Sequence, residues 1–270
     1  MSDQPSIQKH SVMKDDFGWD VPVEAVPVPS EGKVYPQGSA LHNRNILHVK
    51  SMTAREEDIL SSRALIQQGI VITTLLESCL VDDNVDVRDM LIGDRNALMV
   101  SVRITGYGTA YKADVSCPEC GKKGNQDFDL SGLEIKRLSL DPIREGENIF
   151  LFTLPVTGKE VHFRFLRGAD EEEMNLTAER RRKMMPDAKI DSLVTSRLEQ
   201  LIVSIDGVSD RNKINAFVKD MPALDSRKLR TFIENNEPGI DMSVWMNCAQ
   251  CNQESRVSLP IGAGFFWPSD

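Results

Sequence analysis

The sequence lacks long apolar runs and is poor in aromatic residues. None of its 270 residues belongs to an uninterrupted apolar stretch of the ~18 residues needed to cross a bilayer. The first 20 residues are polar, with no apolar core and no small-residue cleavage site, so we expect a soluble protein that is not exported and has no membrane partner.

Common catalytic and nucleotide-binding motifs are also missing. The sequence contains no Walker loop, GxGxxG, GxSxG or HExxH motif, which argues against nucleotide binding, serine hydrolysis and zinc proteolysis. Acidic residues outnumber basic ones by 41 to 32, giving a formal net charge of −9. This is the wrong sign for a dedicated binder of polyphosphates, so nucleic acid is not the expected partner. Because the catalytic motifs are missing, a small-molecule substrate is not expected either.

Four of the five cysteines form two CxxC pairs. The pairs are Cys117 with Cys120 and Cys248 with Cys251, and the fifth cysteine is Cys79. Two residues between thiols let a tight turn direct both sulfurs at one point. Two such turns supply the tetrahedral thiolate cage that zinc prefers, with bonds of about 2.3 Å.

The residues around each pair favour a metal-binding turn at the end of a strand. Gly121 has permissive dihedral angles, and Asn252 is able to take a left-handed position. Strand-like runs with alternating character precede the pairs at Tyr111–Ser116 and Met242–Asn247. We therefore predict one structural Zn²⁺ per chain, held where two strand ends meet.

The two halves of this predicted site are far apart in the sequence, since 127 residues lie between Cys120 and Cys248. An ordinary zinc ribbon has roughly 15–20 residues there. Closing so long a loop costs on the order of 5 kcal/mol, whereas structural zinc contributes on the order of 10–16 kcal/mol in peptides. The binding free energy of zinc therefore exceeds the cost of closing the loop.

Three other interpretations of the CxxC pairs remain open. An active dithiol usually follows a thioredoxin-like βαβ pattern, and two copies would be redundant. Disulfides suit an exported protein, but the fifth cysteine and the missing signal segment disfavour them. A catalytic zinc keeps an open position, which four thiolates close. We expect Cys79, in the apolar run Leu75–Leu80, to be a buried small hydrophobe.

Residues 1–51 contain five of the 13 prolines and show no sustained apolar period, which predicts an extended arm. A solvated tail is the alternative. We expect the arm to lie on a neighbouring subunit, because a spacer has no need of so many β-branched and aromatic anchors. The predicted partner-binding side chains of the arm are those of Val21, Val23, Val26, Val28 and Tyr35.

Apolar periodicity and capping residues after the arm predict several helices and one hairpin. Asp94 is expected to cap a helix, and a hairpin over residues 149–166 places His162 on its solvent face. The clearest amphipathic pattern runs from Asp187 to Ile205. The predicted helices cover residues 53–68, 70–80, 95–105, 187–205, 210–221 and 225–236, and a further helix begins near Asp170.

The glycine-rich segment near residue 265 carries three aromatic side chains, those of Phe265, Phe266 and Trp267. Large aromatic side chains in so short a segment are expected to be buried. They are predicted either to pack on their own domain or to enter a groove on another subunit.

Several strings together resemble the T4-type phage baseplate protein family. They are Lys50–Leu60, residues 93–96 (GDRN), the two CxxC pairs, residues 163–166 (FRFL) and residues 265–268 (FFWP), and their order covers the chain from about Pro29 to Pro268. Members are described as baseplate hub assembly proteins or chaperones of contractile-tailed phages, or as tail components, without established catalysis. The resemblance therefore implies a virion part or an assembly factor, and leaves open whether it stays in the finished tail.

We predict an α+β protein in four parts. These are an extended N-terminal arm (1–51), a helical region with the first zinc knuckle (52–120), an insertion with a β-hairpin and helices (121–241), and the second knuckle with the aromatic tail (242–270). The predicted function is a structural subunit or assembly factor of the baseplate hub, placed in the virion tail and assembled in the host cytoplasm. Its expected partners are other tail proteins and copies of itself.

Two other functions compete with this prediction. A zinc-ribbon nucleic-acid binder would use the basic run at residues 180–183, but acidic residues flank it and no aromatic residues interleave it. An enzyme would draw on His162, Asp94 and Glu173, whose spacing suggests no cooperation. We therefore expect no enzymatic activity.

Overall fold

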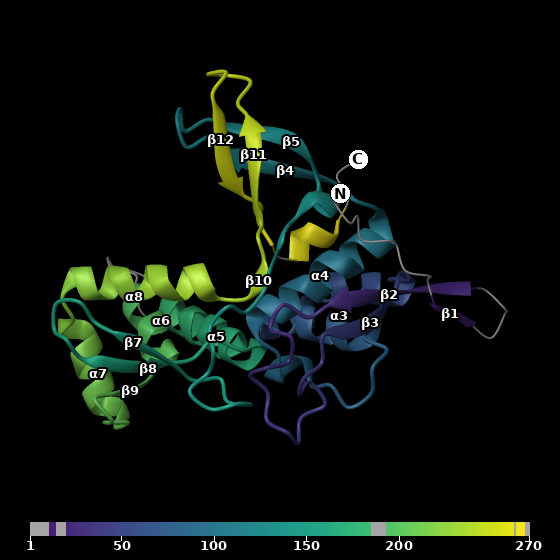
Figure 1. Ribbon diagram of the computed structural model, residues 1–270. Coiled ribbons are helices and arrows are strands. Elements are labelled where there is room, and N and C mark those ends of the chain that lie inside the picture. Colours follow the sequence, from purple (N-terminus) through teal and green to yellow (C-terminus); the bar gives the residue numbers. More distant parts are fainter. Residues whose placement is uncertain (1–10, 15–19, 185–192, 262, 268–270) are drawn as a thin grey trace, which may run out of the picture.

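Helix α4 (Ile92–Tyr107) lies at the centre of the chain, as Figure 1 shows. The computed structural model describes residues 11–14, 20–184, 193–261 and 263–267. Helix α4 contacts the N-terminal sheet, helices on both sides of it in the sequence, and the last described turn. Its residues from Gly93 to Arg103 are almost all buried, as expected for a helix that is surrounded by the rest of the fold.

The described residues form eight helices and five small sheets, which confirms the predicted α+β class. The helices besides α4 are α1 (Ala54–Ser61), α2 (Arg63–Gln68), α3 (Val71–Cys79), α5 (Gly168–Met184), α6 (Leu193–Leu201), α7 (Arg211–Asp220) and α8 (Ala223–Asn236), with 3-10 turns η1 (Val87–Asp89), η2 (Leu130–Gly132) and η3 (Ala263–Phe266).

The strands pair only in small antiparallel groups. The sheets have the orders β1-β2-β3, β4-β5, β6-β10, β7-β8-β9 and β11-β12. The strands are β1 (Ser11–Lys14), β2 (Asp20–Pro27), β3 (Ile46–Lys50), β4 (Ala110–Ser116), β5 (Lys123–Asp129), β6 (Ile135–Lys136), β7 (Phe150–Thr153), β8 (Glu160–Phe163), β9 (Ile202–Ile205), β10 (Gly239–Ile240), β11 (Ser243–Asn247) and β12 (Glu254–Ser258).

The segment predicted as an extended arm is part of the core from Val23 onward. Strands β2 and β3 pair with each other and pack against α4. The side chains of Val23, Val26, Val28 and Tyr35 are each less than 5% exposed within their own chain. The prediction that they bind a neighbouring subunit is therefore wrong, because no surface is left for it. Val21 is half-buried, and residues 1–10 and 15–19 lie outside the described residues.

A buried carboxylate holds the loop after β2 against α4. Asp94 accepts hydrogen bonds from Ser30 N–H (2.8 Å), Ser30 Oγ (2.6 Å) and Tyr35 Oη (2.6 Å). The Tyr35 hydroxyl in turn accepts from Leu91 N–H at 2.8 Å. Asp94 therefore does not cap the helix as predicted. Leu91 precedes the first turn of α4, Asp94 lies within that turn, and its side chain bonds another segment.

Close approach of α4 to β10 requires Gly93. A Cβ atom added at Gly93 would lie 1.7 Å from the carbonyl oxygen of Pro238, so no other residue fits there without moving the backbone. Strand β10 pairs with β6, and the two strands bring together both ends of the segment between them. That segment carries β7 to β9 and α5 to α8.

The predicted hairpin is present as β7 and β8, in which Phe150 lies opposite Phe163 and Leu151 opposite His162. The predicted amphipathic helix at 187–205 is only partly confirmed. Helix α6 ends at Leu201, and the apolar residues from Ile202 to Ile205 form β9, which pairs with β8. The open edge of β8 favours a strand for this β-branched run. Residues 187–192 lie outside the described part.

The aromatic tail packs on its own chain. Phe265 and Phe266 are 1% and 0% exposed, whereas Trp267 is 40% exposed. The buried guanidinium of Arg103 donates to the carbonyl oxygens of Phe265 (3.1 Å), Gly108 (2.8 Å) and Ala110 (3.0 Å). The prediction that Phe265 and Phe266 bind a partner is therefore wrong, because these rings complete the core beside α4.

Replacing Tyr35 by Phe should lower the free energy of unfolding by about 1–3 kcal/mol, because the buried Asp94 carboxylate and the Leu91 N–H each lose a partner. Denaturant unfolding would measure this loss. The control is Tyr107→Phe, which removes a half-buried hydroxyl that bonds Glu57 at 2.6 Å in a place where water can replace it. Equal losses in the two variants would contradict the assigned role of Asp94.

Candidate metal centre

The four CxxC cysteines meet at the tips of two hairpins. Cys117 and Cys120 lie in the turn between β4 and β5, and Cys248 and Cys251 lie in the turn between β11 and β12. One ligand atom from each of the four lies within 4.8 Å of the others. In Figure 1 the two hairpins stand together above α4, although Cys120 and Cys248 are 128 positions apart.

The sulfur positions fit a tetrahedral ion. The Sγ atoms of Cys117 and Cys251 are 3.7 Å apart, as are those of Cys120 and Cys248. Four sulfurs placed about 2.3 Å from one ion at tetrahedral angles lie roughly 3.8 Å from each other. The donor set and its spacing therefore fit a single metal ion such as zinc.

The two turns share one backbone pattern, which explains why the sequence builds the same half-site twice. The N–H groups of Cys117 and Cys248 donate to carbonyl oxygens five residues ahead, at 2.9 and 3.0 Å. The N–H groups of Gly121 and Asn252 donate back to the first cysteine of each pair, both at 2.8 Å. Gly121 and Asn252 both have positive φ angles, 70° and 54°, as the sequence suggested.

The surroundings of the four cysteines favour the deprotonated form of one thiol and disfavour that of its neighbour when no cation is bound. Backbone N–H groups of Cys251 and Gln250 lower the pKa of the Cys248 thiol to about 6. A backbone N–H of Gln253 acts in the same direction on Cys251, yet burial and the neighbouring thiols raise the pKa of Cys251 to about 12. Four negative sulfurs so close together require a bound positive charge.

This geometry favours one interpretation of the cysteines over the others. All five are free thiols in the structure, and the 3.7 Å separations exceed the roughly 2.05 Å of a disulfide bond. A redox-active dithiol needs only one CxxC pair, whereas here the thiols of both pairs lie together at one point. Cys79 stands apart, fully buried, and burial raises its pKa to about 12, as expected of a thiol that packs as a small hydrophobe.

The hairpins are also held together away from the sulfurs. Tyr111, Ala113 and Val115 of β4 are buried, as are Met246 of β11 and Val257 of β12. Near the base of the hairpins, Tyr111 Oη donates to the carbonyl oxygen of Pro260 at 3.3 Å. The ring of Tyr111 packs edge-on against Phe265, 5.0 Å between centroids. A metal at the tips would therefore fix one end of a unit whose other end is joined to α4.

The residues considered for an enzyme are not assembled into one site. Asp94 is bonded to Ser30 and Tyr35, and His162 Nδ1 bonds Ser204 Oγ at 3.0 Å on the face of β8 and β9. Glu173 lines a pocket of about 620 Å³ between α3 and α5. Among the described residues, no hydrogen bond or ion pair links any two of the three.

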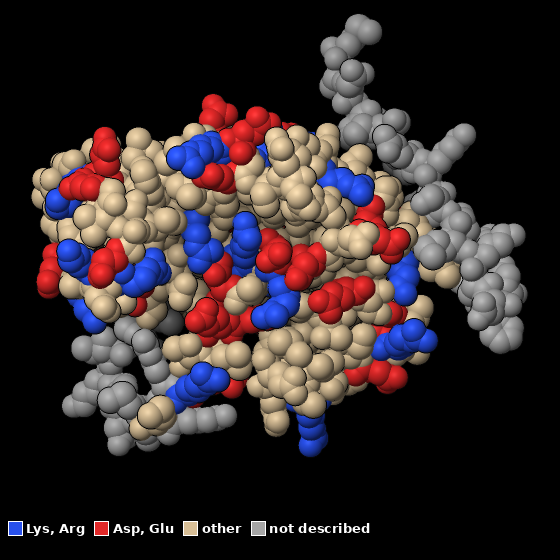
Figure 2. All heavy atoms as spheres, turned by 90° about the horizontal axis from the view of Figure 1, so that it is seen from below, with Lys and Arg blue, Asp and Glu red and all other residues tan. Residues whose placement is uncertain are grey.

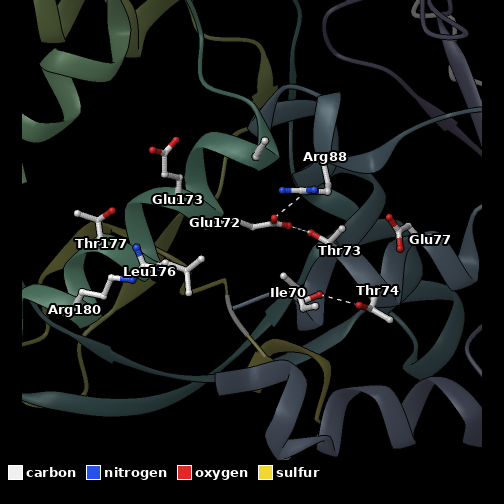
Figure 3. A pocket seen from close by; sticks show the side chains of 11 residues that line it. Ile70, Thr73, Thr74, Glu77, Arg88, Glu172, Glu173, Leu176, Thr177 and Arg180 are labelled. Atoms are coloured by element: carbon white, nitrogen blue, oxygen red, sulfur yellow. Dashed lines mark hydrogen bonds and ion pairs between the residues drawn. The ribbon is translucent and has the colours of Figure 1, made fainter. Parts of the chain in front are cut away.

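Figure 3 shows that the pocket beside Glu173 is lined by polar groups from α3, η1 and α5. The buried carboxylate of Glu172 accepts a hydrogen bond from Thr73 and pairs with Arg88 Nε at 3.0 Å. The most buried polar groups of the pocket therefore satisfy each other. Burial and the nearby Asp86 raise the pKa of Glu77 at the rim.

The basic run at residues 180–183 does not form a described basic surface. Of these four side chains only that of Arg180 is described, and it lines the pocket beside Glu173. On the face shown in Figure 2, acidic and basic side chains are interspersed. This distribution gives no support to the nucleic-acid interpretation.

Sequence reasoning missed one exposed aromatic residue next to the metal centre. Trp245 on β11 is 66% exposed and lies directly opposite Arg256 on β12. The sequence contains the pattern that would have identified it. Trp245 stands between Val244 and Met246, so in a strand its side chain faces away from the buried side.

Comparison with known proteins gives one match. The model of the family described as T4 bacteriophage base plate protein matches residues 28–267. This range contains both hairpins, α4 and the insertion. Searches of curated proteins and of solved structures found no match. None of the described helices is long and apolar enough to span a membrane.

Replacing Cys248 by Ser should abolish metal binding and lower stability, because three sulfurs no longer close the cage. A loss of at least about 5 kcal/mol, which remains of the metal's contribution after the loop-closure cost is subtracted, corresponds to a melting temperature lower by at least roughly 10–20 °C. Elemental analysis of the purified chain and melting with and without chelator measure both effects.

Cys79→Ala is the control for this experiment, since it removes a buried thiol far from the hairpins. It should lose some stability but keep one metal ion per chain. A Cys248→Ser variant that retains one ion per chain and melts like the unmodified protein would disprove the four-thiolate centre.

Proposed function

The chain belongs to the T4 bacteriophage base plate protein family, and from this we propose that it serves the hub region of a phage tail baseplate as a structural subunit or assembly factor. It acts by docking other tail proteins on a scaffold fixed by one zinc ion. Family membership implies a virion tail component and suggests a structural protein instead of an enzyme. The supporting observation is that the family match includes both cysteine turns, which meet at one point.

Zinc is the metal we propose because the donor set is four thiolates at tetrahedral spacing. Such a site is closed, without an open position for substrate, and so contributes stability. The side chain of Lys122 donates to Gln250 Oε1 at 3.3 Å, joining the two turns beside the sulfurs. Its positive charge partly offsets the net negative charge of a zinc tetrathiolate. In the reducing host cytoplasm, where we place assembly, zinc persists where disulfides do not.

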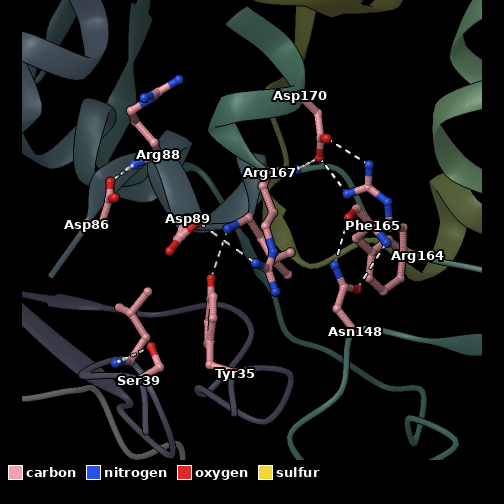
Figure 4. Close-up of polar contacts among 12 residues, drawn as sticks. Tyr35, Ser39, Asp86, Arg88, Asp89, Asn148, Arg164, Phe165, Arg167 and Asp170 are labelled. Carbon is pink, nitrogen blue, oxygen red and sulfur yellow. Dashed lines mark hydrogen bonds and ion pairs between the residues drawn. The ribbon is translucent and has the colours of Figure 1, made fainter. Parts of the chain in front are cut away.

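A docking protein needs surfaces that keep their relative positions, and the insertion is tied firmly to the core. Figure 4 shows the corner between β8 and α5, where the guanidinium of Arg164 forms two hydrogen bonds with Asp170, at 2.6 and 2.7 Å. Asn148 bonds both the N–H and the carbonyl of Phe165, at 3.0 and 2.8 Å. These paired contacts fix β8, α5 and the loop at Asn148 against one another, so the insertion is stiff where it meets the core.

Backbone hydrogen bonds attach the insertion to the start of α4 and to the residue pair before it. The N–H of Ile92 donates to the carbonyl of Leu166 at 3.0 Å, and the N–H of Gly168 donates to the carbonyl of Met90 at 2.9 Å. The metal-bearing hairpins and the insertion are thus both joined to one helix. We propose that this arrangement presents two separate docking surfaces at a fixed distance.

Two exposed tryptophans are the proposed contacts with partner subunits. Trp245 is 66% exposed on the metal-bearing hairpin, and Trp267 is 40% exposed after the buried phenylalanines. Tryptophan is enriched among residues that dominate binding energy at protein interfaces. Of the partner-binding side chains predicted from the sequence, Trp267 and the half-buried Val21 are the ones that remain accessible.

Replacing Trp245 by Ala should leave folding and metal content unchanged but weaken incorporation into baseplates. A loss of about 2 kcal/mol at the interface lowers affinity roughly 30-fold. The measurement is the amount of chain that sediments with baseplates or their assembly intermediates, from infected cells that make only the variant. Ile66→Ala is the control, since Ile66 is 46% exposed but lies on α2, outside both proposed docking surfaces. Full incorporation of the Trp245→Ala variant would remove Trp245 from the interface.

A further inference from the structure

A groove of about 340 Å³ lies between the two metal-bearing hairpins, along β4 and β12. Residues 114–116 and Pro118 line one side, and residues 256–258 and Pro260 line the other. We propose that this groove receives an extended strand of another baseplate subunit, which adds to the open edge of β4. The inference rests on the proposed function and names the kind of contact that the protein makes.

The hydrogen-bond pattern of β4 shows which backbone groups face the groove. Cys117 N–H donates to Lys122 on the β5 side, so the odd-numbered residues of β4 pair with β5 and the even-numbered ones point away. Ala110 agrees with this alternation, because its carbonyl oxygen accepts from Arg103 Nη2 at 3.0 Å, outside the hairpin. The N–H and C=O groups of Lys112, Asp114 and Ser116 therefore form an open edge.

The facing strand is open in the same way. Cys248 N–H donates to Gln253 and Leu259 N–H donates to Met242, so the odd-numbered residues of β12 pair with β11. The peptide groups of Arg256 and Ser258 consequently point away from β11. Although β4 and β12 run alongside each other, within the described residues they form no common sheet. Two rows of unpaired backbone donors and acceptors thus border one groove.

The opposite seam, between β5 and β11, is closed. Gln126 Nε2 donates to the carbonyl oxygen of Asn247 at 2.7 Å, and Lys122 bonds Gln250. On the β4 side the described bridging contacts lie at the ends only, where Tyr111 bonds Pro260 and Cys117 meets Cys251. The openness of the β4 seam is therefore a particular feature of this side and not a general property of the hairpins.

The two charged side chains that line the groove, Asp114 and Arg256, bond to other residues of their own chain. Proteins discourage edge pairing with charged side chains that project from the edge. Here Asp114 Oδ1 accepts from Asn125 Nδ2 at 3.0 Å within the same hairpin, and Arg256 pairs with Asp241 at 2.5 Å. The charge of Arg256 is thus offset by Asp241, and the uncharged amide of Asn125 holds the Asp114 side chain to its own hairpin without neutralising it.

The shape of the groove selects an extended strand over a second copy of this chain through the same edge. Both open edges border the groove, so a second β4 would have to enter it with β5 still attached, whereas a single extended strand brings only itself. An inserted strand of about five residues would match the open run from Lys112 to Ser116. Alternate side chains of that strand would face Val115 and Val257, which are 5% and 8% exposed, so we expect small apolar residues there.

The test compares proline on the two edges of one hairpin. Asp114→Pro removes an N–H that faces the groove, whereas Asp127→Pro removes one that faces away from it on β5, where Asp127 lies opposite Lys112. Neither N–H belongs to the β4–β5 ladder, so both variants should bind metal and melt alike. Asp114→Pro should lower incorporation into baseplates at least tenfold, and Asp127→Pro should not change it.

A second variant and a second measurement cover the case in which proline disturbs the turn. Ser258→Trp fills the groove from β12 without altering the β4 backbone, and should lower incorporation to the same extent. Amide hydrogen exchange at Asp114 and Ser116 should slow at least tenfold in purified baseplates relative to the free chain. Crosslinking from a photoreactive residue at position 116 should reach a different tail protein.

The outcomes separate this inference from the proposed function. If the unmodified chain associates with neither baseplates nor their intermediates, the proposed function fails. If it associates but the Asp114→Pro and Ser258→Trp variants do so equally well, without slowed exchange, the groove is not the docking site. Crosslinks to a second copy of this chain alone would overturn the stated occupant.

Discussion

Convergence of four sulfurs from two remote turns is the constraint that joins the β4–β5 hairpin to the β11–β12 hairpin. The sulfurs of Cys117 and Cys251 lie 3.7 Å apart, a separation that four thiolates tolerate only around a cation. The small sheets on either side are two-stranded, and an isolated two-stranded hairpin is marginally stable in water. The two hairpins are held together at the cysteine turns, along their buried faces and where they join α4. Together these contacts stabilise two hairpins that would be marginal alone.

Helix α4 connects that unit to everything else, through two buried polar side chains. Asp94 in its first turn binds the loop after β2, and Arg103 in its last turns binds the carbonyl of Phe265. Each side chain satisfies backbone or hydroxyl groups from a distant segment, so each fixes position as well as contributing stability. Leu91, Ile92 and Gly93 add the contacts to the insertion and to β10.

The sequence predicted best what depends on short spacing. The CxxC turns, with Gly121 and Asn252 in left-handed positions, follow from local chemistry, and the structure brings their thiols together while the metal itself stays a prediction. The sequence was least informative where contacts between distant segments determine the local structure. Nothing in the spacing of Val23, Val26 and Tyr35 reveals that Asp94 draws their segment into the core, and Ile202 to Ile205 continue a helical period until β8 offers an edge.

The distance between the half-sites along the chain sets an order of events during synthesis. The ribosome adds about 5–20 residues per second, so the first cysteine turn waits roughly 6–26 s before the second one, 128 positions later, has been made. Both turns have the same backbone pattern. During that interval the first turn of one nascent chain is able to accept the second turn of a neighbour on the same message. Any interlocking of two polypeptides through exchanged turns would therefore depend on translation speed and on the local density of nascent chains.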